Sequence, residues 1–334
     1  MQTNTKQKKI LVTGTAGFIG YHLAEALLKG GYFVVGVDNF TPYYDVRMKE
    51  ARHKLLQKNK KFHFYKISIA DYAALEKVVK KEKPDVIVNL AAQAGVRFSL
   101  KDPWSYADAN YLGTLNIFEV AQKYRVKRVL FASSSSVYGD NTKTPFSESD
   151  ATDHPMSVYA ASKKGNETLA YAYHSLYGIE TAGMRFFTVY GRYGRPDLAI
   201  FKFTKNIILG KPINVYNQGA MKRSFTHVDD VVRGVQSLIE KKDLKYEIYN
   251  LGGDEVTPLV TFIKMLEKRI GKKAVMNLMS IQAGDVPSTI ADTTKARRDL
   301  GYRPRVSMEE IVVDFVDWFL ENKAWLLKLK EPKQ

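Results

Sequence analysis

Tyr159 and Lys163 are the residues whose types and spacing could do chemistry most directly. If this segment is helical, residues four apart lie on one face, so the phenol and the ammonium would be neighbours. We expect the ammonium to lower the pKa of the phenol from about 10 toward neutrality, making Tyr159 a base able to take a proton from a hydroxyl group. A solvent-facing tyrosine and lysine without a catalytic role is the structural alternative.

A run of serines precedes this pair in the chain. Ser134, Ser135 and Ser136 directly follow an apolar strand predicted over residues 129–133. If the strand persists, Ser134 and Ser136 share one face and Ser135 lies opposite. A hydroxyl there could relay a proton to Tyr159, or the run could simply cap or loosen the strand end.

The element that would position these groups lies near the N-terminus. Ile10 to Val12 form an apolar strand, and Gly14, Gly17 and Gly20 follow it at the start of a helix. Glycines allow positive φ and close backbone approach, and a helix N-terminus offers free N–H groups to a pyrophosphate. The Gly-x-x-Gly-x-x-Gly spacing predicts a dinucleotide site, with a loop that serves packing alone as the alternative.

Asp38 indicates which dinucleotide this site would prefer. It ends a second strand predicted over residues 32–37. A carboxylate there can accept both hydroxyls of an adenosine ribose and would repel a 2′-phosphate. The sequence therefore favours NAD over NADP.

Strands and helices alternate over the first 187 residues, which predicts an α/β fold with a doubly wound parallel (Rossmann) sheet. A single helix is expected from Pro103 to Tyr124, and a sixth strand from Glu180 to Phe187. Beyond about residue 188 the pattern loosens. We predict an NAD-binding domain over residues 1–187 and a smaller α/β substrate lobe over residues 188–334, with some of its segments returning to the main sheet.

Composition excludes several classes of protein. The chain has no cysteine, which excludes disulfides, thiolate catalysis and cysteine-ligated metal centres. No apolar run approaches 18 residues, so we expect no membrane span. The first nine residues form a short polar segment, so we expect no signal peptide and a cytoplasmic location. The net charge of +16 comes from lysines scattered along helices, so we expect no nucleic-acid partner. The charge could steer an acidic, phosphorylated substrate or be solvated surface charge.

Six motifs together resemble one family. They are Thr13-Gly-Thr-Ala-Gly-Phe-Ile-Gly20, Ser133-Ser-Ser-Ser-Val-Tyr-Gly139, Tyr159-Ala-Ala-Ser-Lys163, Arg185-Phe-Phe-Thr-Val-Tyr-Gly191, Arg223-Ser-Phe-Thr-His-Val-Asp-Asp230 and Gly284-Asp-Val-Pro287. With them the chain resembles the extended short-chain dehydrogenase/reductases, and among these the nucleotide-sugar 4-epimerases, most closely those acting on UDP-glucuronate. The resemblance implies that tightly held NAD oxidises the sugar at C4, the 4-keto intermediate turns over, and hydride returns to its other face. UDP-glucuronate and UDP-galacturonate would be interconverted.

The resemblance also implies roles for particular residues. Tyr159 would be the base, Lys163 would hold the nicotinamide ribose, and Ser134 would hydrogen-bond the 4-hydroxyl. The expected cofactor contacts, besides Tyr159 and Lys163, are Gly14, Gly17, Phe18, Ile19, Gly20, Asp38, Asn39, Ser68, Ile69, Ala91, Ala92, Asn110, Ser133 and Phe186. The expected substrate contacts are Arg97, Ser134, Ser135, Ser136, Thr188 and Arg195, with Arg223, Phe225, Gln282 and Asp285 at the UDP end. No metal ligand is expected.

Thr188 and Arg195 are the candidates that select the sugar. Thr188 ends the sixth strand and Arg195 lies in the loop just beyond it, so both can converge on the sugar site. An enzyme acting on a uronic acid must balance a desolvated carboxylate with charge-assisted hydrogen bonds. The resemblance assigns these two positions to that carboxylate, and neutral-hexose epimerases usually have Asn in place of Thr188. Arg192 is a weaker candidate, and Arg97 could instead support its own loop.

Two departures from the family pattern concern the cofactor, and a third feature concerns the reaction. Ser68 follows Ile67 where the family usually has Asp, and Asn89 stands where His is frequent. Related dehydratases and decarboxylases carry an acid where this chain has Ser135 and Ser136, which argues for epimerisation. The alternatives are a UDP-glucose/UDP-galactose 4-epimerase, a dehydratase or decarboxylase, and a non-catalytic nucleotide sensor. A homodimer through two helices is the family habit.

Overall fold

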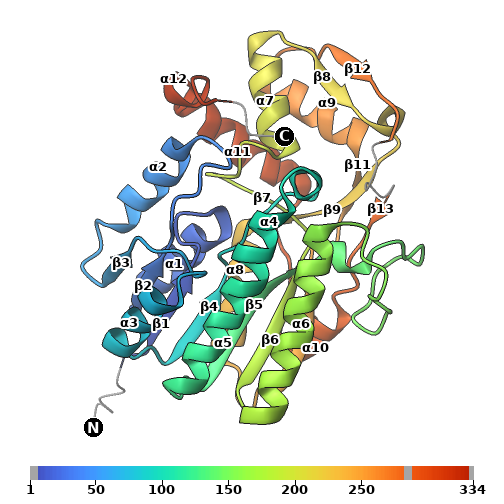
Figure 1. Cartoon of the computed structure of the whole chain (residues 1–334). Helices are drawn as coiled ribbons and strands as arrows, with labels where there is room; N and C mark the ends of the chain where they lie inside the picture. The colour runs from blue at the N-terminus through green and yellow to red at the C-terminus, as the bar shows by residue number, and fades with distance from the viewer. Residues whose placement is uncertain (1–6, 282–287, 331–334) are drawn as a thin grey trace.

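A seven-stranded parallel sheet forms the centre of the computed structural model, which describes residues 7–281 and 288–330 (Figure 1). The strands lie in the order β10-β6-β5-β4-β1-β2-β3. Their bounds are β1 Lys9–Thr13, β2 Phe33–Val37, β3 Phe62–Tyr65, β4 Val86–Asn89, β5 Arg128–Ser134, β6 Glu180–Phe186 and β10 Tyr246–Leu251. The pairings are all parallel, which confirms the predicted doubly wound fold. The strand order reverses between β1 and β4, so ligands are expected outside the carboxyl ends of these strands.

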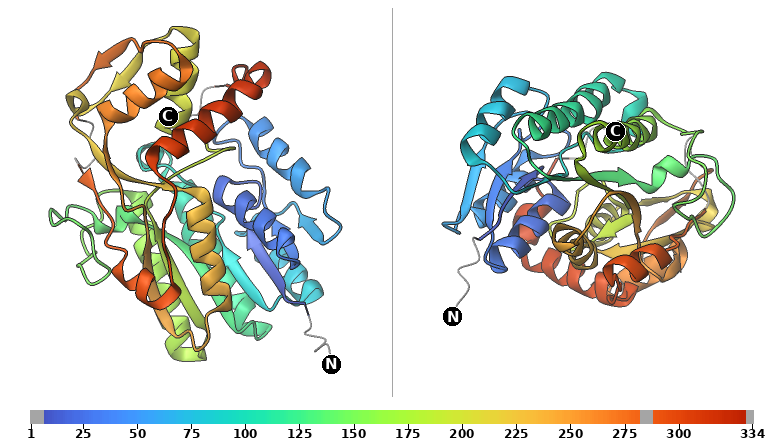
Figure 2. Two further views of the ribbon diagram at one scale, coloured as in Figure 1. Left: turned by 180° about the vertical axis from the view of Figure 1, so that it is seen from behind. Right: turned by 90° about the horizontal axis from the view of Figure 1, so that it is seen from below.

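Helices cover both faces of this sheet, as the views from opposite sides show (Figures 1 and 2). The helices of one face are α1 Phe18–Lys29, α8 Val228–Glu240 and α10 Thr294–Leu300, and those of the other are α3 Tyr72–Glu82, α5 Gly113–Lys123 and α6 Val158–Tyr177. Side chains of a strand alternate between faces. In β1, Ile10 and Val12 accordingly pack in the first core and Leu11 in the second.

A smaller lobe with its own core lies beyond the carboxyl edge of the sheet, at the top of Figure 1. Its helices are α7 Ala199–Leu209, α9 Leu259–Ile270, α11 Met308–Glu321 and α12 Lys323–Leu326. Its short strands are β7 Thr188–Tyr190, β8 Ile213–Val215, β9 Lys222–His227, β11 Val256–Pro258, β12 Met276–Leu278 and β13 Ser288–Thr289. Although β10 comes from the C-terminal half of the chain, it pairs with β6 in the main sheet. The domain boundary at residue 187 stays a prediction.

The helix expected from Pro103 to Tyr124 is interrupted, so that prediction was wrong in detail. It consists of α4 Pro103–Tyr106, a π-helical segment Ala107–Leu112, and α5. Within the wider turn, the fully buried Asn110 accepts a hydrogen bond from the Gln93 N–H at 2.8 Å and donates to the Ser162 hydroxyl at 2.9 Å. Such π-helical turns are often found at functional sites. Here the turn ties the chain after β4 to α6.

The serine run also departs from the strand geometry that the period-two argument requires. Strand β5 ends at Ser134, and Ser135–Tyr138 form one turn of 3₁₀-helix. The Ser134 hydroxyl caps this turn by accepting from the Ser136 N–H at 3.1 Å, and it lies 3.2 Å from the Ser136 hydroxyl. Ser134 therefore caps the 3₁₀ turn, and its hydroxyl lies at the end of β5.

Within residues 7–281 and 288–330, no helix is long and apolar enough to cross a bilayer.

Candidate active site

A cavity of about 320 Å³ opens at the carboxyl ends of the central strands. This is an ordinary size for a small-molecule site. The glycine loop forms one wall. Gly14 has a φ of +75°, and a Cβ there would lie 2.9 Å from the Ala91 nitrogen. A Cβ on Gly20 would lie 2.0 Å from the Gly14 carbonyl oxygen, so only glycine allows this close loop.

Asp38 lies in the same cavity, oriented by two backbone amides. Its Oδ2 accepts from the Ala16 N–H at 3.0 Å and its Oδ1 from the Phe40 N–H at 2.8 Å. A carboxylate has about four lone-pair sites, so acceptors remain for ribose hydroxyls. The glycine cradle and this oriented carboxylate fit the adenosine half of NAD.

We expect Asp38→Ala to weaken NAD binding and to relax discrimination against NADP, because the substitution removes the ribose acceptor and the charge that repels a 2′-phosphate. Equilibrium titration of the cofactor-free protein with each dinucleotide measures both effects. Unchanged dissociation constants for both dinucleotides would contradict the assignment of Asp38.

The catalytic candidates also line this cavity. Tyr159 and Lys163 project from the first turns of α6, and Ser134 comes from the end of β5. The buried Lys163 ammonium donates to the Ala132 carbonyl at 2.9 Å and lies 6.0 Å from the centre of the Tyr159 ring. The three side chains therefore converge where a sugar hydroxyl and a nicotinamide ribose would have to meet.

Burial of the Tyr159–Lys163 pair acts against the expected fall in the pKa of the phenol, and that fall stays a prediction. Desolvation raises the pKa of the Tyr159 phenol, while a hydrogen bond with Ser134 and the charge of Arg195 act in the opposite direction. Burial acts on the neighbouring lysine in the opposite direction, and it lowers the pKa of Lys163 to about 8.

Thr188 and Arg195 line the same cavity, as the sequence predicted. The Arg195 guanidinium is held by Asp197, with Nε donating to Oδ1 at 2.9 Å and Nη2 donating to Oδ2 at 2.5 Å. The Tyr43 hydroxyl also donates to Asp197, at 3.2 Å. Although burial would raise it, the pKa of Asp197 is held below its usual range by Arg195. The cavity thus contains an oriented, ion-paired arginine.

Comparison with known proteins agrees with this geometry. A protein-family model described as GDP-mannose 4,6 dehydratase matches residues 11–315. The chain belongs to this family of extended short-chain dehydrogenase/reductases.

Relatives share nearly the whole length. A protein of Methanocaldococcus jannaschii without an assigned function is 51% identical over 97% of this chain and 100% of its own. A probable UDP-glucuronate 4-epimerase of Rhizobium meliloti is 43% identical over 94% of this chain and 97% of its own. The crystal structure of the Bacillus cereus UDP-glucuronic acid 4-epimerase with UDP-glucuronic acid and NAD has a TM-score of 0.90 and 35% identity, covering 94% of this chain and 99% of that one. The resemblance predicted from the motifs is confirmed.

Most of the residues predicted to contact cofactor or substrate in this short-chain dehydrogenase/reductase line one cavity. They are Gly14, Gly17, Phe18, Ile19, Gly20, Asp38, Asn39, Ser68, Ile69, Ala91, Ala92, Ser133, Ser134, Tyr159, Lys163, Phe186, Thr188 and Arg195. Asn110 lies behind the wall and holds Gln93, which itself lines the cavity. Asn89, a departure from the family pattern, joins β1 to α5 by accepting from Thr13 at 2.6 Å and donating to Thr114 at 3.1 Å.

The other predicted substrate residues that the structure describes are not among those that line this cavity. The Arg97 guanidinium lies over the Tyr216 ring, 5.1 Å from its centre. Arg223 of β9 is opposite Thr289 of β13 in the strand register. The Phe225 ring stacks on Tyr190. Ser135 and Ser136 belong to the 3₁₀ turn. Gln282, Asp285 and the Gly284–Pro287 motif lie outside the described residues. Substrate contact by any of these stays a prediction.

Sequence reasoning missed several side chains of this family member's site. Tyr43, Tyr44 and Lys49 line the cavity, and Asp197 orients Arg195. The Tyr43-Tyr44 pair follows the second strand closely, and that position is a signal that could have found it. Asp197 carries a weaker signal, as an acid two residues from a candidate cation.

Proposed function

We propose that this protein is an NAD-dependent 4-epimerase that interconverts UDP-glucuronate and UDP-galacturonate. The observation that carries the proposal is one cavity that brings Tyr159, Lys163 and Ser134 together with Thr188 and Arg195. The first three can move a proton at a sugar hydroxyl, and the last two can hold a carboxylate. The family and the similarity to UDP-glucuronate 4-epimerases support the same activity.

The residues of the cavity have different roles in this reaction. When bound, NAD would supply the acceptor, and later the donor, of the C4 hydride, and the glycine loop, Asp38 and Lys163 would hold it. Tyr159 takes the proton of the 4-hydroxyl as the C4–H bond breaks, giving a 4-keto sugar. Ser134 hydrogen-bonds that oxygen, and the Lys163 ammonium stabilises the phenolate. After the keto sugar has turned its other face, the same proton returns from Tyr159 to the oxygen, which inverts C4 with no net oxidation.

Arg195 supports the acidic sugar because its charge is desolvated in the cavity wall. A guanidinium has five N–H donors, and the pair with Asp197 uses two of them. Donors therefore remain for a second carboxylate, and the Thr188 hydroxyl can add another. A hydrogen bond between charged groups in such a site is worth about 1.5–3 kcal/mol.

One observation favours the alternative of a UDP-glucose/UDP-galactose 4-epimerase. Asp197 already balances the charge of Arg195, so a neutral C6 hydroxymethyl group would leave no unpaired cation. Thr188 favours the uronate, since its hydroxyl is a further donor in the same cavity. The two functions predict different substrate preferences.

We expect Arg195→Ala to cost about 1.5–3 kcal/mol in transition-state binding of UDP-glucuronate, and much less for UDP-glucose. The measurement is kcat/KM for both sugars. Arg192→Ala is the matched control, because Arg192 lies in the same loop but is half-exposed and pairs with Asp314 outside the cavity. Equal losses for the two sugars in Arg195→Ala would remove the carboxylate role.

We also propose a homodimer formed by residues 100–112 and the outward face of α6. Large apolar side chains are exposed over this face: Leu100, Trp104, Tyr111, Leu112, Val158 and Tyr171. The small residues Ala161 and Gly165 lie among them, which would let a helix of a second copy approach closely. A face of this kind is self-complementary under two-fold symmetry. Sedimentation at micromolar concentration should give a dimer, and a monomer there would contradict the proposal.

A cytoplasmic location is part of the same proposal, because NAD and UDP-sugars are cytoplasmic metabolites. Fractionation of the source cells checks it, and recovery of the protein outside the cytoplasm would contradict it.

A further inference from the structure

We propose that Arg52 is a positioning residue that joins two loops. One is the glycine loop, residues 14–17, and the other is the substrate loop, residues 191–196, which carries Arg195. Arg52 belongs to α2 Val46–Leu56, whose Lys49 lines the cavity, and no part of the Arg52 side chain reaches solvent. It does not line the cavity itself. The proposal rests on the proposed function, since it concerns how Arg195 is placed for an acidic sugar.

The Arg52 guanidinium binds backbone from two separate loops at once. Its Nη1 donates to the Ala16 carbonyl, within the glycine loop, at 2.8 Å. On the other side, Nε and Nη2 donate to the Tyr193 carbonyl at 3.0 and 2.7 Å, and Nη2 reaches the Gly194 carbonyl at 3.4 Å. Tyr193 and Gly194 directly precede Arg195. One side chain therefore sets the distance between the two loops.

The connection continues to Asp38 through a single residue, Ala16. The Ala16 carbonyl accepts from Arg52, and the Ala16 N–H donates to the Asp38 carboxylate at 3.0 Å. A shift of Arg52 would therefore move the loop that carries Arg195 and the group that orients Asp38 together. Arg52 thus links the backbone next to Arg195 to the backbone that orients Asp38.

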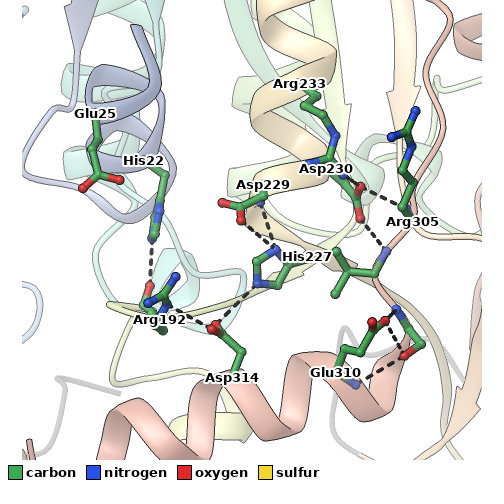
Figure 3. Close-up of polar contacts among 12 residues, drawn as sticks. His22, Glu25, Arg192, His227, Asp229, Asp230, Arg233, Arg305, Glu310 and Asp314 are labelled. Carbon is green, nitrogen blue, oxygen red and sulfur yellow. Dashed lines mark hydrogen bonds and ion pairs between the residues drawn. The ribbon is translucent and has the colours of Figure 1, made fainter. Parts of the chain in front are cut away.

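The substrate loop is fastened to other elements as well (Figure 3). The His22 ring donates to the Arg192 carbonyl at 2.8 Å, and the Arg192 guanidinium pairs with Asp314 of α11 at 3.1 Å. These contacts hold the outer end of the loop against α1 and α11. Arg52 holds the inner end, next to Arg195, and its contacts include the glycine loop.

Arginine suits this position for a physical reason. The fifth hydrogen bond, from Nη1 to the Tyr44 hydroxyl at 2.6 Å, means that all five N–H donors of the guanidinium are used, each toward a neutral oxygen. A lysine would keep the charge, but its compact ammonium has three donors and cannot span both loops. Misplacement of a reacting or binding group by about 1 Å can cost roughly 100-fold in rate.

The test compares Arg52→Lys and Arg52→Met in the full, NAD-loaded protein with Lys54→Met, an exposed position on the same helix. We expect Arg52→Lys to reduce the preference for UDP-glucuronate over UDP-glucose, as a ratio of kcat/KM values, by about 10-fold or more. It should also retain less NAD after prolonged dialysis, read from the absorbance of the cofactor. In an Arg195→Ala background, Arg52→Lys should change the preference no further, since the group it positions is gone.

The outcomes separate this proposal from its alternatives. A lower melting temperature with unchanged substrate preference and unchanged NAD retention would mean that Arg52 only stabilises the fold, and would overturn the proposal. If Arg52→Met does not fold, Arg52→Lys decides, because it keeps the charge and the side-chain length. If the wild type shows no preference between the two sugars, the proposed function fails, and NAD retention in Arg52→Lys still decides whether Arg52 links the loops.

Discussion

Tyr159→Phe should lower turnover by about 10²–10⁴-fold while NAD stays bound. The substitution removes one oxygen, the atom proposed to take the 4-hydroxyl proton, and leaves the ring that packs edge-on against Tyr106 at 6.0 Å. Lys163 keeps its hydrogen bond to the Ala132 carbonyl, so the cofactor wall is unchanged. Steady-state kinetics together with the NAD content of the purified variant measure both parts of the prediction.

Tyr177→Phe is the matched control, because Tyr177 lies at the end of the same helix and is exposed outside the cavity. It should leave turnover unchanged. Loss of NAD from Tyr159→Phe would indicate a structural role for the phenol, and full activity of that variant would end the proposal that Tyr159 is the base.

Glu167→Gln should destabilise the protein by about 3–5 kcal/mol, since it leaves the buried Arg185 without its counter-charge. Glu167 and Arg185 are almost fully buried and form two hydrogen bonds, at 2.9 and 2.8 Å. The Ser133 hydroxyl also donates to Glu167, at 2.6 Å. This cluster holds α6 against the ends of β5 and β6, where Ser134 and Tyr159 must meet.

Urea denaturation followed by circular dichroism measures this loss. Glu309→Gln provides the comparison, because Glu309 pairs with Lys268 on the surface and such pairs contribute about 0–1 kcal/mol. If both variants lost less than about 1 kcal/mol, the buried pair would not be what holds these elements together.

The parts of the site that depend on local backbone chemistry could be predicted from the sequence. The glycine loop needs residues without a Cβ, and Gly14 and Gly20 have the close contacts that this requirement implies. Asp38 could be identified because it comes directly after the second strand. The Tyr159–Lys163 pair depends on helical spacing, which α6 provides. Each of these signals lies within a few residues of the chain.

The features that the sequence did not reveal depend on tertiary contacts. The π-helical turn around Asn110 exists because the amide side chain reaches Gln93 and Ser162 from other elements. Arg52 lies within a basic helix, and nothing in its neighbours distinguishes it from the exposed Lys54. The spacing of Tyr159 and Lys163 likewise does not reveal that desolvation raises the pKa of the phenol, because its burial arises only in the folded cavity.

Incubation of the wild-type protein with UDP-glucuronate, without added NAD, tests the proposed function most directly. Nuclear magnetic resonance should show UDP-galacturonate accumulating to an equilibrium mixture, and kcat/KM should be higher for UDP-glucuronate than for UDP-glucose. Equal kcat/KM values for the two sugars would contradict the uronate assignment and favour the UDP-galactose epimerase.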